Sequence, residues 1–207
     1  MKQLRPLFVI TLALFVLCCL VYPGVVTAAA QILLPDRANG SLVERNGKVV
    51  GSALIGQSVA DFAAHPEYLW GRASAASNDA ATGITYSSGS NYGPLNSALV
   101  EEVKARVALL RASGVDGPIP VDLVTKSASG LDPHVSPASA ELQVPRIAST
   151  RKITESKVKE LISKHTEQST LGFLGEARVN VLLVNLDLDS EAPYAASPPA
   201  PSAAPAK

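Results

Sequence analysis

The sequence has little cysteine and histidine and no excess of either charge. Its two cysteines, Cys18 and Cys19, are adjacent in an apolar run, so they can build neither a disulfide framework nor a cysteine-ligated zinc site. The three histidines, His65, His134 and His165, are scattered without a metal-binding spacing such as HxH or HExxH. Lys and Arg total 18, as do Asp and Glu, so the chain lacks the basic excess that sequence-independent nucleic-acid binding requires. We therefore expect no metal site and no nucleic-acid partner.

Charge is also absent from a long N-terminal stretch. Residues 7–22 are uncharged, and a helix of this length spans about 24 Å, less than the roughly 30 Å hydrocarbon core of a membrane. Pro23-Gly24 interrupts this run, but the uncharged stretch continues to Leu34. A proline within a membrane helix is tolerated where the freed carbonyl finds another donor. The sequence thus predicts a short N-terminal stub and a transmembrane helix within residues 1–34.

Two interpretations of this segment stay open. Lys2 and Arg5, an apolar region and the small residues at 28–30 are typical of a cleaved signal peptide. The length of the apolar region, with Tyr22 placed as an interfacial anchor, favours a retained membrane anchor. Both interpretations hold the basic N-terminus in the cytoplasm and place the remainder outside.

Residues 35–190 are predicted to form one extracytoplasmic domain of mixed helices and strands, of the α+β class. At 156 residues such a domain buries enough surface to be stable without disulfides. Residues 191–207 are rich in Pro, Ala and Ser and are expected to be a disordered tail.

Within the domain, turn and cap residues mark the expected elements. Asn46-Gly47 predicts a hairpin that leads into a strand over 48–57, and residues 76–96 have loop composition. A helix is expected from Asn96 or Ser97 to Gly114, with apolar residues from 99 to 110 on one face and Glu101, Glu102, Lys104 and Arg106 on the other. The other expected elements are a strand at 120–125, a helix from Ser136-Pro137 that Pro145 bends or ends, a helix at 154–162 and a buried strand at 178–188.

The densest polar cluster, residues 127–136, contains the residue types of a hydrolase triad. A secreted serine hydrolase would use Ser129 or Ser136 with His134 and Asp122. The chain lacks a GxSxG nucleophile elbow, however, and Asp132 and His134 flank a proline on one turn. Helix capping by Asp132 and Ser136 is the favoured interpretation.

Two further features invite a binding role. The Gly/Ser run 87–94 could cradle an anion with its backbone amides, but it lacks the GK[ST] ending of a nucleotide-binding P-loop, so a turn that contacts a partner is favoured. Trp70, the only tryptophan, is expected to pack in a core or interface, where Arg72 could stack on its ring.

Five blocks in one order carry a resemblance to a known family. They are residues 51–57 (GSALIGQ), 68–75 (YLWGRASA), 88–96 (SGSNYGPLN), 122–136 (DLVTKSASGLDPHVS) and 175–182 (GEARVNVL). With these blocks the chain resembles the C subunits of Kdp potassium-transporting ATPases from its N-terminal span to about Asp189. It departs from the usual pattern at Ala73, Ser88, Lys126 and Ala128, and the tail lies outside it. Lys126 adds a charge to the polar loop.

The resemblance implies an accessory, single-span subunit of an ATP-driven potassium importer in the inner membrane. Its partners would be a channel-like potassium-binding subunit, a P-type ATPase subunit and a small membrane subunit. Family members are described as catalytic chaperones that raise the ATP affinity of the hydrolysing subunit. ATP and potassium would be substrates of the complex, because this chain has no DKTG phosphorylation motif and no selectivity-filter run.

The resemblance implies a nucleotide or partner contact at Ser88, Gly89, Ser90 and Asn91, and no catalytic residue. Beside it we expect a role in assembly and in shaping the potassium entrance. The partner or ion-entrance loop for this role contains Asp122, Thr125, Asp132, His134 and Ser136, joined by Trp70 and Arg72. The expected orientation places residues 88–91 across the membrane from cytosolic ATP, so any effect on ATP binding would be transmitted through the partner subunits. A free-standing potassium-binding module is a third possibility, disfavoured because flexible neutral oxygen ligands rarely select potassium.

Overall fold

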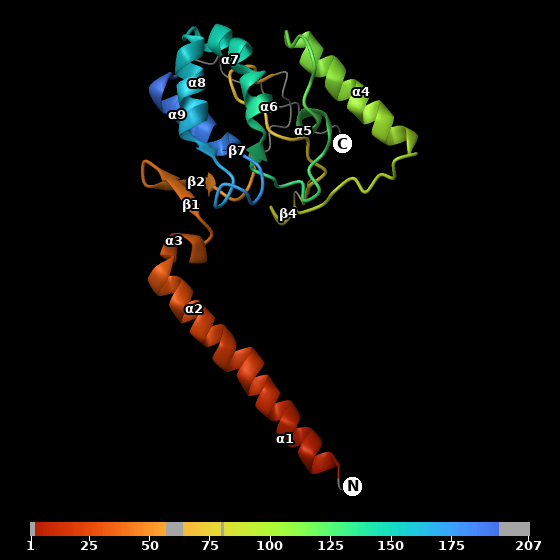
Figure 1. Cartoon of the computed structure of the whole chain (residues 1–207), viewed down its shortest axis with the longest axis vertical. Helices are drawn as coiled ribbons and strands as arrows, with labels where there is room; N and C mark the ends of the chain where they lie inside the picture. The colour runs from red at the N-terminus through yellow and green to blue at the C-terminus, as the bar shows by residue number, and fades with distance from the viewer. Residues whose placement is uncertain (1–2, 57–63, 80, 195–207) are drawn as a thin grey trace. The chain divides into compact units, whose positions relative to one another are not determined.

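The structure is a computed structural model that describes residues 3–56, 64–79 and 81–194. Its backbone contacts divide the chain into two units, Met1–Leu54 and Ile55–Lys207, which we describe separately (Figure 1). The first unit includes residues 35–54, which follow the apolar helix in the sequence. The predicted tail lies outside the described residues from position 195 onward.

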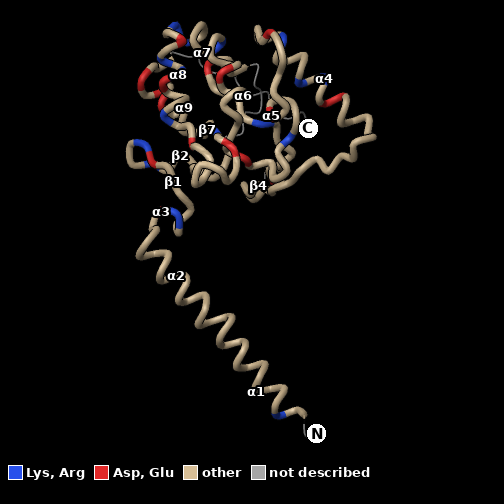
Figure 2. Tube along the Cα trace, in the orientation of Figure 1, with Lys and Arg blue, Asp and Glu red and all other residues tan. Residues whose placement is uncertain are grey.

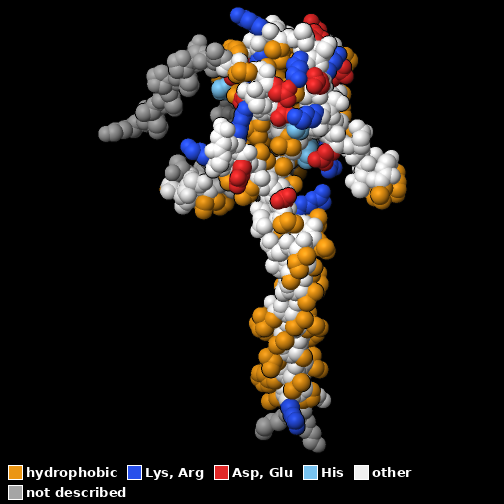
Figure 3. All heavy atoms as spheres, turned by 90° about the vertical axis from the view of Figure 1, so that its left-hand side faces the viewer, with side chains coloured by type: hydrophobic (Ala, Val, Ile, Leu, Met, Phe, Trp, Pro, Cys, Tyr) orange, Lys and Arg blue, Asp and Glu red, His pale blue; other side chains and the backbone are white. Residues whose placement is uncertain are grey.

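The first unit begins with one continuous helix of 30 residues, Leu4–Leu33, long and apolar enough to cross a membrane. It comprises α1 (Leu4–Phe15), a π-helical segment (Val16–Val21) and α2 (Tyr22–Leu33), and none of its residues is buried. Its length of about 45 Å exceeds the hydrocarbon thickness of roughly 30 Å. Figure 3 shows hydrophobic side chains along it, and Figure 2 shows the absence of charged residues between Arg5 and Asp36.

Pro23 lies within this helix without ending it, as the predicted transmembrane helix requires. The Tyr22 N–H donates to the carbonyl of Leu17, five residues back, which is the bond of a wide π turn. Such a local widening ahead of a proline accommodates the missing N–H without ending the helix. The helix therefore continues through Pro23-Gly24 to Leu33.

A short helix and a hairpin complete the first unit. After α3 (Pro35–Ala38), strands β1 (Leu42–Arg45) and β2 (Lys48–Ser52) pair antiparallel. Asn46 and Gly47 have φ of 52° and 73°, the pair of positive values that a type I′ turn requires, so the predicted hairpin is confirmed. Its second strand ends at Ser52, before the predicted end at residue 57, which lies outside the described residues.

The second unit combines helices with small antiparallel sheets, as an α+β fold predicts (Figure 1). A three-stranded sheet has the order β5 (His134–Val135), β7 (Arg178–Asn180), β6 (Thr166–Glu167), and β3 (Ser77–Asn78) pairs with β4 (Thr85–Tyr86) inside the predicted loop. The helices are α4 (Ser97–Ala112), α5 (Val121–Val124), α6 (Pro137–Glu141), α7 (Val144–Arg151), α8 (Glu155–Lys164) and α9 (Val181–Glu191).

Side-chain caps start four of these helices. Asn96, Ser136, Thr154 and Asn180 each accept a hydrogen bond from a backbone N–H in the first turn of α4, α6, α8 and α9. The three predicted helices are thereby confirmed. Pro145 acts as expected, since α6 ends at Glu141 and Pro145 lies in the first turn of the next helix, α7.

Three expectations about local structure were wrong. Residues 121–124 form a helical turn rather than a strand, with Leu123 buried and Asp122 turned toward the start of α6. The apolar run 178–188 is strand only to Asn180, whose side chain caps α9 and converts the remainder to helix. Arg106 is buried, although its position in the charge pattern of α4 suggested a solvated face.

Two hydrophobic clusters meet at neighbouring residues of one extended segment. Leu69 packs with α7, α8 and α9 side chains such as Ile147, Val158 and Val184. Trp70 packs in a second cluster with Leu110, Val115 and Leu123. Because adjacent side chains of an extended segment point in opposite directions, this segment joins the two clusters.

Side chains make most of the hydrogen bonds of the backbone at residues 66–71, and the Tyr68 N–H bonds to the backbone carbonyl of His65. The Asn185 amide accepts from the Leu69 N–H at 2.8 Å and donates to the Leu69 carbonyl at 3.0 Å. The Gln143 amide makes the same two bonds with Trp70, at 2.8 and 3.1 Å. The carbonyls of Pro66 and Tyr68 accept from Arg146, that of Glu67 from Arg151, and that of Gly71 from Arg106.

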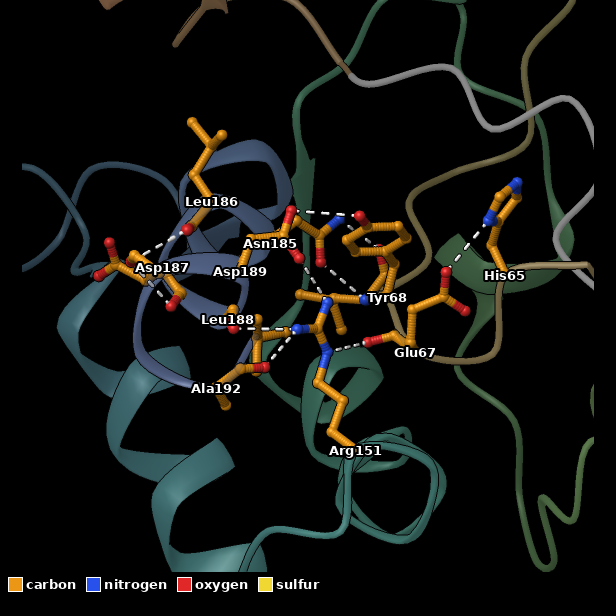
Figure 4. Close-up of polar contacts among 12 residues, drawn as sticks. His65, Glu67, Tyr68, Arg151, Asn185, Leu186, Asp187, Leu188, Asp189 and Ala192 are labelled. Atoms are coloured by element: carbon orange, nitrogen blue, oxygen red, sulfur yellow. Dashed lines mark hydrogen bonds and ion pairs between the residues drawn. The ribbon is translucent and has the colours of Figure 1, made fainter. Parts of the chain in front are cut away.

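Arg151 extends the same network to the end of α9 (Figure 4). Its fully buried side chain donates to the carbonyls of Leu188 and Ala192 and pairs with the Asp189 carboxylate at 2.8 Å. The Tyr68 hydroxyl donates to the same carboxylate. Burial, followed by the charge of Asp189, raises the pKa of Tyr68, so its hydroxyl stays protonated as this donor.

We predict that replacing Gln143 with methionine strongly destabilises the protein. Methionine matches the volume but cannot make the hydrogen bonds that the Gln143 amide forms with the buried N–H and C=O of Trp70, and their loss should cost on the order of 3 kcal/mol. Urea unfolding of the full chain in detergent measures this loss. Gln168→Met, at an exposed position, is the control and should change stability by less than about 0.5 kcal/mol; equal effects of the two variants would contradict the role of Gln143.

Candidate functional site

Three loops that are distant in the sequence are hydrogen-bonded together in the second unit. The Ser127 N–H donates to the Ala73 carbonyl at 2.9 Å, and the Ser74 hydroxyl donates to the Gly130 carbonyl at 2.7 Å. The Ser88 N–H donates to the Ser129 carbonyl at 3.0 Å. Residues 73–76, 87–89 and 127–130 thus form one loop cluster, which contains parts of three of the blocks that carry the family resemblance.

Two glycines allow these loops to approach closely. A Cβ built on Gly89 would lie 2.7 Å from the Ala128 carbonyl oxygen. A Cβ on Gly130, whose φ is +69°, would lie 2.7 Å from the Ser88 carbonyl oxygen and 2.8 Å from the Ala76 nitrogen. The Gly/Ser run is therefore packed against a second loop, and the Ser88 amide is used internally rather than offered to an anion.

A groove of about 500 Å³ lies beside this cluster and gathers five of the predicted site residues. Arg72, Asp122, Asp132, His134 and Ser136 line it. Trp70, Thr125 and residues 88–91 are placed elsewhere: Trp70 is buried in the core, and the Thr125 hydroxyl donates to the Val121 carbonyl at the end of α5.

Arg72 and Asp132 form the ion pair of the groove. The guanidinium Nη1 lies 3.1 Å from the Asp132 carboxylate, and Nη2 donates to the carbonyl of Lys126. The other oxygen of Asp132 accepts from the His134 N–H at 3.0 Å. The cation stacked on the Trp70 ring is Arg146 rather than Arg72, with its guanidinium carbon 3.8 Å from the ring centroid.

Asp122 is an internal acceptor in the groove wall. It receives the Ser136 N–H at 2.7 Å, the Ser139 hydroxyl at 2.6 Å and the Ser136 hydroxyl at 3.3 Å. Burial alone would raise the pKa of Asp122, but these hydrogen bonds outweigh burial and hold the pKa below its usual range. Asp122 is thus an ionised anchor between α5 and α6.

The contacts of Ser136 and His134 do not form a hydrolase triad. The Ser136 hydroxyl bonds to Asp122 and Ser139 and caps α6, and His134 Nδ1 lies 3.6 Å from Asp132. Burial, followed by the charge of Arg178, lowers the pKa of His134, so the ring is neutral near pH 7. The residues are those of a capped helix and a strand end, and the secreted serine hydrolase is not supported.

The structure adds groove residues that the sequence analysis did not select. Arg178, the first residue of β7, and Glu176 and Ala177 just before it also line the groove. These residues lie in the last of the five blocks that carry the family resemblance, so the sequence offered one reason to select them. Their position beside Asp132 and His134, however, depends on the antiparallel pairing of β5 with β7. Among the described residues, no group of three or more His, Cys, Asp and Glu side chains has the arrangement of a metal site.

Lys126 connects the loop cluster to α4. Its ammonium lies 2.8 Å from Glu102 and 5.9 Å from the centroid of the Tyr92 ring, while the Tyr92 hydroxyl donates to the same carboxylate. The hydrogen bond from Lys126 lowers the pKa of Glu102. The charge that departs from the family pattern is therefore paired.

Comparison with known proteins matches residues 4–190 to the family described as "KdpC: K+-transporting ATPase, c chain". The chain belongs to the KdpC family. It is 52% identical over 191 residues to a protein of Sorangium cellulosum named "Potassium-transporting ATPase KdpC subunit", covering 91% of this chain and 98% of that protein. Proteins of the same name from Burkholderia mallei and Burkholderia pseudomallei are 51% identical over 197 residues, covering 92% of this chain and 97% of each relative.

The KdpC match spans both structural units. It includes the apolar helix, the loop cluster and the groove, and it ends at residue 190, just before the end of α9. The resemblance inferred from the five blocks is thereby confirmed.

We predict that Gly130→Ala destabilises the protein more than a matched glycine substitution. Gly130 combines a positive φ with contacts that leave no room for a Cβ, whereas Gly117, with φ of +85°, has open space around it. Gly117→Ala should cost about 1–2 kcal/mol from backbone strain alone, and Gly130→Ala at least twice as much. The urea midpoints of the two variants provide the measurement, and equal losses would show that close loop packing contributes nothing.

We also predict that Asp122→Asn destabilises the protein in a pH-dependent manner. Because the folded pKa of Asp122 is lowered, its charge stabilises the protein above the unfolded pKa near 3.9, and this contribution is lost as pH falls through the folded value. The variant should lose about 1–3 kcal/mol at pH 7 and approach the parent protein near pH 3. Exposed Asp116→Asn is the control for the urea titration, and a constant loss at all pH values would contradict the assignment.

Proposed function

We propose that this chain is an accessory single-span subunit of a potassium-transporting ATPase complex in the inner membrane. Its second unit lies outside the cytoplasm and contacts partner subunits near the potassium entrance. The observation that carries the proposal is the match to the KdpC family over residues 4–190, which covers the helix and the body together. The partners are a channel-like potassium-binding subunit, a P-type ATPase subunit and a small membrane subunit.

The N-terminal helix supports retention as a membrane anchor. Its 30 residues exceed the 7–15 residues of a signal-peptide apolar region, and the helix continues past the small residues at 28–30. Lys2 and Arg5 lie before the apolar stretch, which favours an N-terminus in the cytoplasm.

The charge of the second unit supports a place beside a cation pathway. Residues 55–194 contain 16 Asp and Glu and 12 Lys and Arg, a net charge of −4. A negative surface near a pore raises the local concentration of cations and the rate at which they arrive. The chain supplies no phosphorylation chemistry and acts by positioning and assembly.

The packing of residues 88–91 supports an indirect effect on ATP. The Ser88 amide bonds to Ser129, and Gly89 lies against Ala128, so the run is a structural loop within this fold. A subunit on the outer side changes ATP affinity by binding one conformation of its partners more tightly, which is a coupling free energy.

The proposal is tested in cells that express the complete complex with a tagged ATPase subunit. A chain that ends after Leu54 keeps the helix and hairpin but lacks the second unit. It should fail to copurify with the complex or should lower its apparent potassium affinity, while a control that ends after Tyr194, beyond the family match, should behave as the full chain. Unchanged assembly and potassium affinity without the second unit would overturn the proposed role.

Orientation is measured in the same cells with a membrane-impermeant thiol reagent. In a Cys18→Ser/Cys19→Ser background, Glu155→Cys at the exposed start of α8 should react in intact cells, and Gln3→Cys only after permeabilisation. The opposite pattern would place the body in the cytoplasm.

A further inference from the structure

A second groove, separate from the one at Asp132, lies between the C-terminal end of α4 and helix α7. It has a volume of about 560 Å³, within the range of ligand-binding pockets. Its lining is apolar at Trp70, Leu109, Ala112 and Pro145, and its charged member is Arg146. A neighbouring groove shares Pro145 and Arg146, and its other lining residues include Ala138, Leu142 and the carboxylates of Asp116 and Glu141. The surface that suits an acidic side chain is therefore the groove between α4 and α7 alone.

Arg146 is a largely buried cation whose hydrogen bonds go to neutral acceptors. Its Nη1 donates to the carbonyls of Pro66 and Tyr68, and its Nη2 donates to the side-chain oxygen of Gln143 at 2.6 Å. Within the described part of the chain, its Nε has no hydrogen-bond partner. One face of the guanidinium lies on the ring of Trp70.

The charge of Arg146 lacks the partner that Arg151, one turn further along α7, possesses. Arg151 has Asp189 at 2.8 Å, whereas among described residues no carboxylate lies within ion-pair distance of Arg146. Burial lowers the pKa of Arg146 to about 9, and the attraction of Glu67 offsets this only in part. Glu67 also shares a hydrogen bond with His65 Nδ1 at 3.2 Å. A buried charge without a close counterion is costly, and a carboxylate delivered to the groove would reduce that cost.

We propose that this groove binds an acidic side chain on an apolar segment of a partner subunit, with Arg146 as the counterion. The inference rests on the proposed function, because it assumes a partner at this face. A carboxylate suits the site better than a phosphate: one guanidinium with unused N–H donors matches one carboxylate fork, whereas a phosphate brings more charge than a single cation balances. The apolar walls of Leu109, Ala112 and Pro145 supply the contact area, while the buried ring of Trp70 lies against the Arg146 guanidinium.

A tethered carboxylate tests the electrostatic part in the full chain. Ser149 lines the groove three residues after Arg146 on α7, so the two side chains share one helix face. Ser149→Asp should raise the midpoint of thermal unfolding by about 3 °C relative to Ser149→Asn, and 1 M salt should reduce the difference. No gain from Asp over Asn would show that Arg146 needs no counterion and would overturn the proposal.

Photo-crosslinking in the assembled complex tests the occupant. A photoreactive residue at Ala112, on the groove wall, should capture one partner segment that contains Asp or Glu beside apolar residues, and Ser149→Asp should reduce that product several-fold while Ser149→Asn leaves it unchanged. A captured segment without an acidic residue, or a product insensitive to Ser149→Asp, would overturn the proposal.

Stabilisation of the isolated full chain by sodium acetate without any crosslink to a partner would also overturn the proposal, since the site would then hold a free carboxylate. If the complex assembles with the full chain but no crosslink forms, this groove is excluded and the proposed subunit role stands.

Discussion

The second unit depends on a buried extended segment that has no strand partner among the described residues. Residues 66–71 carry Leu69 into one hydrophobic cluster and Trp70 into the other, and the backbone polar groups of these two residues and of Gly71 are buried. Buried backbone groups must be hydrogen-bonded. Here Arg106 from α4, Gln143, Arg146 and Arg151 from the α7 region and Asn185 from α9 provide the bonds that a sheet would otherwise supply.

This arrangement makes the helices and the segment mutually dependent. Each side chain spans from a helix to the same short stretch of backbone, so a shift of α4, α7 or α9 would leave a buried group unpaired. The stretch continues into Arg72 and Ala73, which hold the polar groove and the loop cluster in place through Asp132, Lys126 and Ser127. The hydrogen bonds of Arg106, Arg146 and Arg151 therefore hold in place the backbone that leads into the polar groove and the loop cluster.

The polar side chains of the groove at Asp132 and of the loop cluster are likewise hydrogen-bonded to one another. Asp122, Ser136 and Ser139 satisfy one another at a helix start, His134 is held neutral in a strand, and Lys126 is paired with Glu102. Groups that would have to act as nucleophile or base are engaged as caps and anchors. Two surface features remain in this member of the KdpC family: an ion-paired groove at Arg72 and Asp132, and Arg146, which has no close carboxylate among the described residues.

Much of the local structure could be predicted from the sequence, because it depends on short-range chemistry. The apolar helix, the Asn46-Gly47 turn, the caps at Asn96, Ser136 and Thr154 and the break at Pro145 all follow from residues within a few positions of one another. The uniformly apolar run after Asn180 was ambiguous, since periodicity does not separate a buried strand from a buried helix. Its outcome depends on the Asn180 cap and on Asn185, which must reach Leu69.

The candidate site, too, could be predicted only in part from the sequence. The sequence alone determined which blocks carry the family resemblance and therefore which residues to examine. Only the tertiary structure decided that Arg72, Asp132 and His134 share a groove with Glu176 and Arg178, that Trp70 stacks with Arg146, and that Arg106 is buried. The reason is physical, because a long polar side chain is buried only where another segment offers carbonyls to accept its hydrogen bonds. Those carbonyls are distant in the sequence: Gly71 lies 35 positions from Arg106, and Glu67 lies 84 positions from Arg151.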